Sequence, residues 1–236
     1  NHSKYIFWIS VLLIWTISTL FDRLWWNFYS STPSWDQADY LNSALDHARA
    51  LSFMGGKLSV DFSSLLDKSP KIPPLASIVN GAVIAFAGDD PHDAAWSLSL
   101  WNGFLIFNIA SWGLYLRGRK FALLCVLITA FSPFLFHLRT DYVLELPLVS
   151  AITFYLFHLG KWSDQSCGGK WIQLIIAAIA CALSLLIKQS SLLVIIPSLL
   201  FIFFLSLKKD KKFRLQLLCL VTINILTVLP WFYHNW

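Results

Sequence analysis

Charged residues are scarce in this sequence, in which Asp, Glu, Lys and Arg make up only 13% of 236 residues. A soluble globular domain carries about a quarter charged residues, so the composition excludes that class. Hydrophobic residues reach 57%, and the chain contains 12 Trp and 19 Phe. We therefore predict an all-α polytopic membrane protein.

Charged residues are absent from the long hydrophobic segments. Seven such runs approach or exceed the length that crosses a hydrocarbon core of about 30 Å, and we predict about seven transmembrane helices. The run 146–160 is short, so its helix is expected to begin near Asp141. A further short run, 72–88, is ambiguous. The seven runs cover residues 5–21, 94–116, 121–138, 146–160, 171–187, 189–207 and 215–233.

Lys and Arg in the short connections indicate the orientation, because such connections stay in the cytoplasm. Three basic clusters fall on one side if 72–88 does not cross, so we predict that this run forms an interfacial or re-entrant helix. The N-terminus is then cytoplasmic, and residues 22–93 form the first extracytoplasmic loop of a single transmembrane domain, 1–236. The clusters are Arg117, Arg119 and Lys120; Lys161 and Lys170; and Lys208, Lys209, Lys211, Lys212 and Arg214.

The acidic residues lie almost entirely on the opposite side of the predicted topology. Only Asp164 and Asp210 fall inside. The formal charge of +5 then arises mainly from cytoplasmic loops, so no nucleic-acid partner is predicted. Because an ionised carboxylate near hydrocarbon is costly unless it is partnered, we expect function at the outer face.

The first outer loop contains a predicted amphipathic helix. Ser34 followed by Gln37 is a capping-box pattern. Asp36 and Tyr40 share one face of this helix, because positions three or four apart are stacked. The apolar face predicts a helix that lies on the membrane surface. That face consists of Trp35, Ala38, Leu41, Leu45, Ala48 and Leu51.

Several polar residues of the outer face are candidates for a site, and each also has a structural explanation. Asp36 suits the dipole at a helix start, and Asp141 could cap the next helix. Lys188 falls between two apolar runs with almost no loop, where it either snorkels to the interface or binds a phosphate. Two carboxylates on one face with cations nearby favour a functional site. The basic residues are Lys68, Lys71, Arg139 and Lys188.

The order of these motifs resembles the GT-C superfamily of integral membrane glycosyltransferases, in the branch of the lipid A aminoarabinose transferases and protein O-mannosyltransferases. The chain departs from that pattern at Gln37, where the family often has Glu, and at Ile72, which separates the Lys from the Pro-Pro pair. By this resemblance the chain is the N-terminal, catalytic part of something longer. The motifs are Asp36-Gln37-x-x-Tyr40-x-x-x-Ala44, Lys71-Ile72-Pro73-Pro74-Leu75, Ser132-Pro133, Asp141 and Lys188.

The resemblance implies transfer of a sugar from a polyprenyl-phosphate donor to a lipid, glycan or protein acceptor at the outer face of an inner or plasma membrane. Asp36 is then the general base, and Asp141 a second carboxylate that orients a substrate. An apolar groove between the spans holds the lipid tail. The implied substrate-binding residues are Tyr40, Lys68, Lys71, Arg139, Glu145 and Lys188.

Two points stay open from the sequence. The four cysteines and the histidines show no zinc-ligand spacing, and a divalent metal remains open as a cofactor. A membrane transporter or flippase, or a non-catalytic subunit of a larger complex, is the alternative function. The spans carry no mid-bilayer charges and no inverted repeat, which disfavours a transporter.

Overall fold

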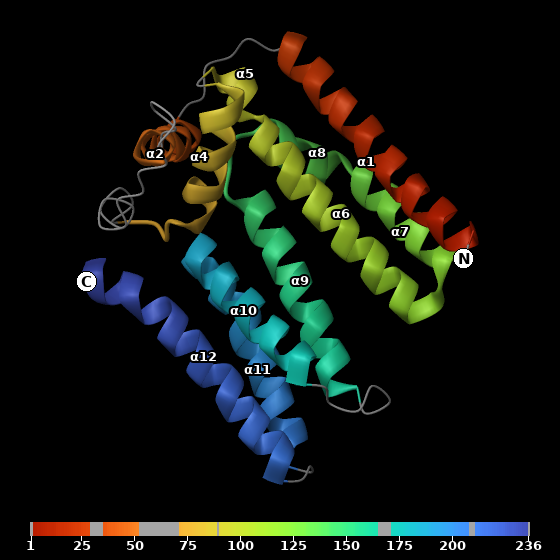
Figure 1. Cartoon of the computed structure of the whole chain (residues 1–236), viewed down its shortest axis with the longest axis vertical. Helices are drawn as coiled ribbons and strands as arrows, with labels where there is room; N and C mark the ends of the chain where they lie inside the picture. Colours follow the sequence, from red (N-terminus) through yellow and green to blue (C-terminus); the bar gives the residue numbers. More distant parts are fainter. Residues whose placement is uncertain are drawn as a thin grey trace.

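The computed structural model describes residues 2–28, 35–51, 71–88, 90–164, 171–207 and 211–235, and all regular secondary structure in these ranges is helical (Figure 1). This confirms the predicted all-α class. The elements are α1 (His2–Phe28), α2 (Asp36–Ala50), α4 (Leu75–Ala87), α5 (Pro91–Ala94), α6 (Trp96–Arg117), α7 (Arg119–Ala130), α8 (Pro133–Thr140), α9 (Glu145–Ser163), α10 (Trp171–Ile187), the 3-10 turn η3 (Gln189–Ser191), α11 (Leu192–Ser206) and α12 (Lys211–Asn235).

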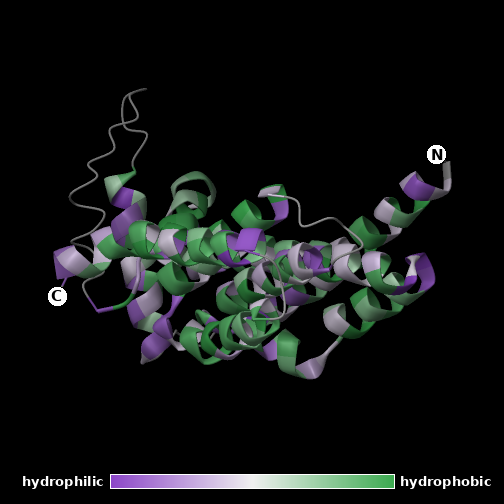
Figure 2. Ribbon diagram, turned by 90° about the horizontal axis from the view of Figure 1, so that it is seen from below, coloured by the Kyte–Doolittle hydropathy of each residue, from purple (hydrophilic) through white to green (hydrophobic). Residues whose placement is uncertain are grey.

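The long helices form a layered bundle in which α9 packs between α6 and α10, α7 packs on α6, and α12 packs on α10. In Figure 1 the N-terminus, the α6–α7 turn and the start of α12 lie along the lower right edge, whereas α2 and α5 lie at the upper left. Arg119 donates a hydrogen bond to Ser3 at the first of these edges. Figure 2 shows hydrophobic residues along the helices and hydrophilic residues concentrated towards the two ends of the view.

Three of the described helical segments are long and apolar enough to cross a membrane: Ser3–Phe28, Gln189–Ser206 and Lys211–Asn235. The pair α7 and α8 adds a fourth if it forms one bent span. The predicted count of seven is not confirmed and stays a prediction. The helix α10 has only 17 residues and is shorter than these three segments. The helix α6 buries several polar side chains. These are Ser97, Ser99, Asn102 and Asn108.

Two predicted boundaries were wrong. The run 121–138 is not one straight helix, because α7 and α8 are bent by 55° at the break before Pro133, and Pro there stands in the first turn of α8. The helix expected to begin near Asp141 begins at Glu145 instead, and Asp141 has an extended backbone after the end of α8. The short helix α4 has 13 residues, about 20 Å, too short to cross the core alone.

The first-loop helix α2 packs on α4, and its predicted place on the membrane surface stays a prediction. A Cβ at Gly81 of α4 would come within 2.7 Å of the Ala44 carbonyl oxygen, so glycine permits the close approach of the two helices. The buried face includes Leu41 and Ala48 of the predicted stripe, together with Ala44 and His47, which the stripe did not include. Trp35 precedes the helix and provides no side-chain cap. The predicted cap, Ser34, lies outside the described residues. Three lysines of the predicted basic clusters also lie outside them: Lys170, Lys208 and Lys209.

The placement of α2 and of the basic turns on opposite edges predicts their accessibility. Single cysteines at the exposed positions Arg49, Lys120 and Lys211 are introduced after removal of the four native cysteines. With a cytoplasmic N-terminus, an impermeant thiol reagent applied outside intact cells should label the Arg49→Cys variant alone. Permeabilised cells serve as the control, in which all three should react. Labelling of Arg49→Cys and Lys120→Cys from the same side would contradict the topology.

Candidate functional site

An ion pair joins the α10–η3 link to the start of α9. Lys188 is the single residue between α10 and η3, and its backbone is extended there, with φ −157° and ψ 134°. Its Nζ donates a hydrogen bond to Oε1 of Glu145, the first residue of α9. Both side chains are partly covered, with 29% of Lys188 and 41% of Glu145 exposed. The pair therefore holds a cation at the junction of three helical elements.

Residues of α2 complete this cluster. Burial acts to lower the pKa of Lys188, but the hydrogen bond and the charge of Glu145, with the nearby charge of Asp36, outweigh it and raise the pKa above its ordinary value. An ordinary Lys is already protonated at neutral pH, so Lys188, with its raised pKa, carries a positive charge at neutral pH. The charges of Asp36 and Glu145 thus both raise the pKa of Lys188.

Tyr40 lies within the same electrostatic environment. Burial raises its pKa, and the charges of Asp36 and Glu145 add to this effect, while Lys188 opposes it. The net shift is upward, so the phenol is neutral at physiological pH and its hydroxyl can donate a hydrogen bond. We define Asp36, Tyr40, Glu145 and Lys188 as the Lys188 cluster.

A cavity of about 320 Å³ opens beside Tyr40, between α2 and the start of α4. Lys71 stands on its wall together with the Pro73 ring and Leu144. The wall thus combines one cation and two carboxylates with apolar and hydroxyl-bearing surface, a composition suited to a ligand with both polar and apolar parts. Its remaining described lining is Asp39, Asn42, Ser43, Asp46, Ile72 and Ser77.

The structure thus brings together five of the eight predicted site residues: the four of the Lys188 cluster, and Lys71 on the wall of the cavity that Tyr40 also lines. Lys68 lies outside the described residues. Asp39 was not singled out from the sequence, although its charge acts on Tyr40 and it lines the cavity. Its position one helical turn after Asp36 could have indicated that Asp39 lies on the same side of α2 as the predicted base.

Arg139 lies in a buried ion pair, and its predicted role as a phosphate partner stays a prediction. Its Nε donates to Oδ2 of Asp22 at 2.8 Å, and the two side chains are only 3% and 2% exposed. The pair uses Nε of the guanidinium, while Nη1 is buried and has no hydrogen-bond partner within the described residues. The partners are 117 positions apart, so nothing in the local sequence pattern indicated the pair.

Asp141 has a local partner. Its Oδ2 lies 3.1 Å from Nε2 of His137 on the preceding helix α8. The next residue, Tyr142, is buried in the same core as Leu41 and Ala44 of α2, and burial raises its pKa to about 12. The turn that carries Asp141 is therefore anchored against α2, while the carboxylate itself pairs with His137.

No group of three or more His, Cys, Asp or Glu side chains in the described ranges is arranged to hold a metal ion. The arrangement is instead a cation held by one carboxylate, with a second carboxylate and a phenol nearby. Such a set can bind an anion and accept a proton at neighbouring points.

Apolar helices with a charged cluster at one end define a polytopic membrane protein with a polar site. Comparison with family models narrows this class: the chain belongs to the dolichyl-phosphate-mannose-protein mannosyltransferase family, whose model matches residues 72–234. This confirms the resemblance to GT-C membrane glycosyltransferases. The match includes Glu145 and Lys188 but begins after Asp36 and Tyr40. No match was found among curated proteins or among solved structures.

The buried pair Asp22–Arg139 should be essential for stability. In the Asp22→Ala variant the Arg139 guanidinium is left buried without a counter-charge, which should lower the free energy of unfolding by about 3–5 kcal/mol. Thermal unfolding of the purified protein in detergent measures the change. The control is Asp46→Ala, whose pair with Arg49 is exposed and should contribute at most about 1 kcal/mol. Equal stability of the two variants would show that the buried pair is dispensable.

Proposed function

We propose that this glycosyltransferase moves a sugar from a polyprenyl-phosphate donor to a lipid, glycan or protein acceptor, with the Lys188 cluster as its active site. The observation that carries the proposal is the Lys188 ammonium paired with Glu145, on which the Asp36 charge at the start of α2 also acts. The family's own description names a dolichyl-phosphate sugar, which supports a donor of this chemical class. Family membership also favours a transferase over a transporter.

The donor chemistry requires a cation where the leaving phosphate gains charge. As the anomeric C–O bond breaks, the bonding electrons go to the lipid phosphate, and a nearby ammonium stabilises that charge. Lys188 supplies one such cation, and Lys71 on the neighbouring cavity wall supplies a second. The lipid tail then extends along the apolar surface of the helices.

The acceptor chemistry requires a base. The acceptor oxygen attacks the anomeric carbon and loses its proton, which the Asp36 carboxylate takes up. Asp36 is exposed at the first position of α2, so an acceptor can reach it. The neutral Tyr40 hydroxyl is a donor for a sugar or phosphate oxygen, and Asp141 is proposed as a second carboxylate that orients a substrate.

This arrangement also fits the predicted orientation. With the N-terminus in the cytoplasm, the Lys188 cluster lies at the extracytoplasmic face of an inner or plasma membrane. A membrane lipid donor can approach it sideways from the outer leaflet, and a soluble or lipid acceptor can approach from the aqueous side.

The base is tested by Asp36→Asn. Asn retains the size of the side chain and the helix-start preference, apart from a dipole contribution of about 0.3–1 kcal/mol. An amide cannot accept the acceptor's proton, so the rate of sugar transfer should fall about 10²- to 10⁴-fold. The assay is transfer from a polyprenyl-phosphate sugar by the full-length protein at matched membrane levels.

The matched control is Asp90→Asn. Asp90 caps α5 by accepting from the His92 backbone amide at 2.8 Å, and Asn caps a helix about as well, so transfer should be unchanged. If Asp36→Asn transferred at the wild-type rate, Asp36 would be only a helix-start residue, and the assignment of the base would be wrong.

A further inference from the structure

Two neighbouring hollows lie on the side of the bundle formed by α1, α6 and α9. One, of about 500 Å³, is lined by α1 and α6, and the other, of about 430 Å³, reaches α9. Both include Trp8 and Phe107, whose rings stack with centroids 5.1 Å apart. Together their walls run along α6 from Leu100 to Tyr115, about 22 Å at 1.5 Å per residue.

The two hollows differ in lining. The first is lined by apolar side chains and Gly103. The Trp15 indole packs so closely there that a Cβ on Gly103 would lie 2.9 Å from Nε1. The second is lined mainly by rings and ends at Lys161 in the last turn of α9. The pair of hollows is therefore mainly apolar, with Asn108, Ser111 and His158 in the wall of the second, and cationic at one end.

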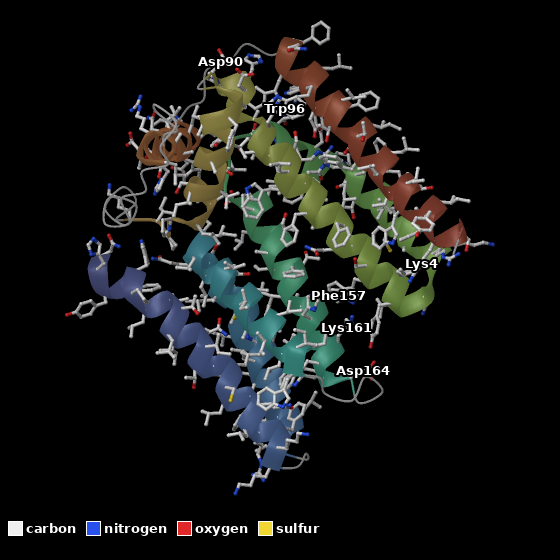
Figure 3. All side chains as sticks on the ribbon, viewed as in Figure 1. Lys4, Asp90, Trp96, Phe157, Lys161 and Asp164 are labelled. Carbon is white, nitrogen blue, oxygen red and sulfur yellow. The ribbon has the colours of Figure 1, made fainter. Side chains whose placement is uncertain are left out.

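Lys161 is held in place by rings. Its Nζ lies 5.1 Å from the Phe157 centroid and 5.7 Å from the Tyr115 centroid. Figure 3 shows Phe157 and Lys161 following one another along the lower part of α9. Within the described residues no carboxylate lies at ion-pair distance from Lys161. Asp164, three residues on, accepts a hydrogen bond from the Tyr115 hydroxyl.

Aromatic rings attract a cation but do not neutralise it. The Lys161 charge is thus available to an anion at the mouth of an apolar hollow. Lys161 is labelled towards the lower right in Figure 3, on the side of the bundle where the α6–α7 turn lies. That turn carries Arg117, Arg119 and Lys120. On the predicted topology this edge meets the cytoplasmic leaflet, which is rich in anionic lipids.

We propose that these hollows form a binding site for one anionic glycerophospholipid. An acyl chain lies along the apolar walls, and the headgroup phosphate contacts the Lys161 ammonium. The site is separate from the Lys188 cluster, which lies at the other end of α9, and the proposal does not depend on the transfer reaction. A tail of any lipid can enter an apolar hollow, so the specificity resides in the charge at Lys161.

The test is a lipid titration of the purified full-length protein followed by native mass spectrometry. Phosphatidylglycerol and phosphatidylcholine with identical acyl chains are compared. The wild type should bind the first phosphatidylglycerol molecule about tenfold more tightly, the size of one charge-assisted contact. Lys161→Met keeps the apolar stem and removes the charge, so the preference should disappear while weak binding of both lipids remains.

Two further variants sharpen the test. Lys120→Met removes an exposed charge at the same edge and should keep the preference. Ser111→Trp fills the second hollow, which Ser111 lines, and should weaken binding of both lipids. If Lys161→Met does not fold, Lys161→Gln replaces it. Thermal unfolding of each variant separates loss of the site from loss of the fold.

Three results would overturn the proposal: equal binding of the two lipids by the wild type, an unchanged preference in the Lys161 variant, or an equal loss in Lys120→Met. Tighter binding of a polyprenyl phosphate than of phosphatidylglycerol would assign the hollows to a carrier lipid instead. Because the readout is lipid binding, a failure here is distinct from a failure of sugar transfer by the Asp36 variant.

Discussion

The ion pair between Lys188 and Glu145 is the interaction on which the proposed site depends. A lysine at the boundary of two apolar helices needs a partner near hydrocarbon, and Glu145 supplies it from the start of α9. The pair fixes the α10–η3 link relative to α9 and holds a charged ammonium within the electrostatic reach of Tyr40 and Asp36 of α2. A donor phosphate can bind the Lys188 ammonium either beside the Glu145 carboxylate or in its place, with little movement of the lysine side chain.

Close packing of α2 on α4 sets the other half of the site. Because Gly81 lets the backbone of α4 approach Ala44, α2 is held against the bundle core, with Leu41 and Ala44 in the same cluster as Tyr142. Tyr40 and Asp36 are then positioned by tertiary contacts. This makes the first-loop helix a fixed wall of the site, and it explains how a carboxylate at its start can act on Lys188.

The sequence indicated the helical class and most members of the cluster, because composition and residue type carry that information. It did not indicate partners. Lys188 was predicted to meet a phosphate, but its contact with Glu145 spans 43 positions. For Arg139 it did not indicate the pairing with Asp22, which exists only in the folded bundle. Likewise the spacing predicted Leu41 and Ala48 on the buried face of α2 but not Ala44 and His47, which lie against Gly81 of α4.

The central claim is that Lys188 binds the donor phosphate, and equilibrium binding of a polyprenyl phosphate to full-length wild type and to Lys188→Met tests it most directly. Met keeps the apolar stem, so the fold should persist while affinity falls by about 1–3 kcal/mol, roughly five- to 150-fold. Lys120→Met, on the opposite edge, should bind as the wild type does. An unchanged affinity in Lys188→Met would make Lys188 a structural partner of Glu145 alone and would contradict the account.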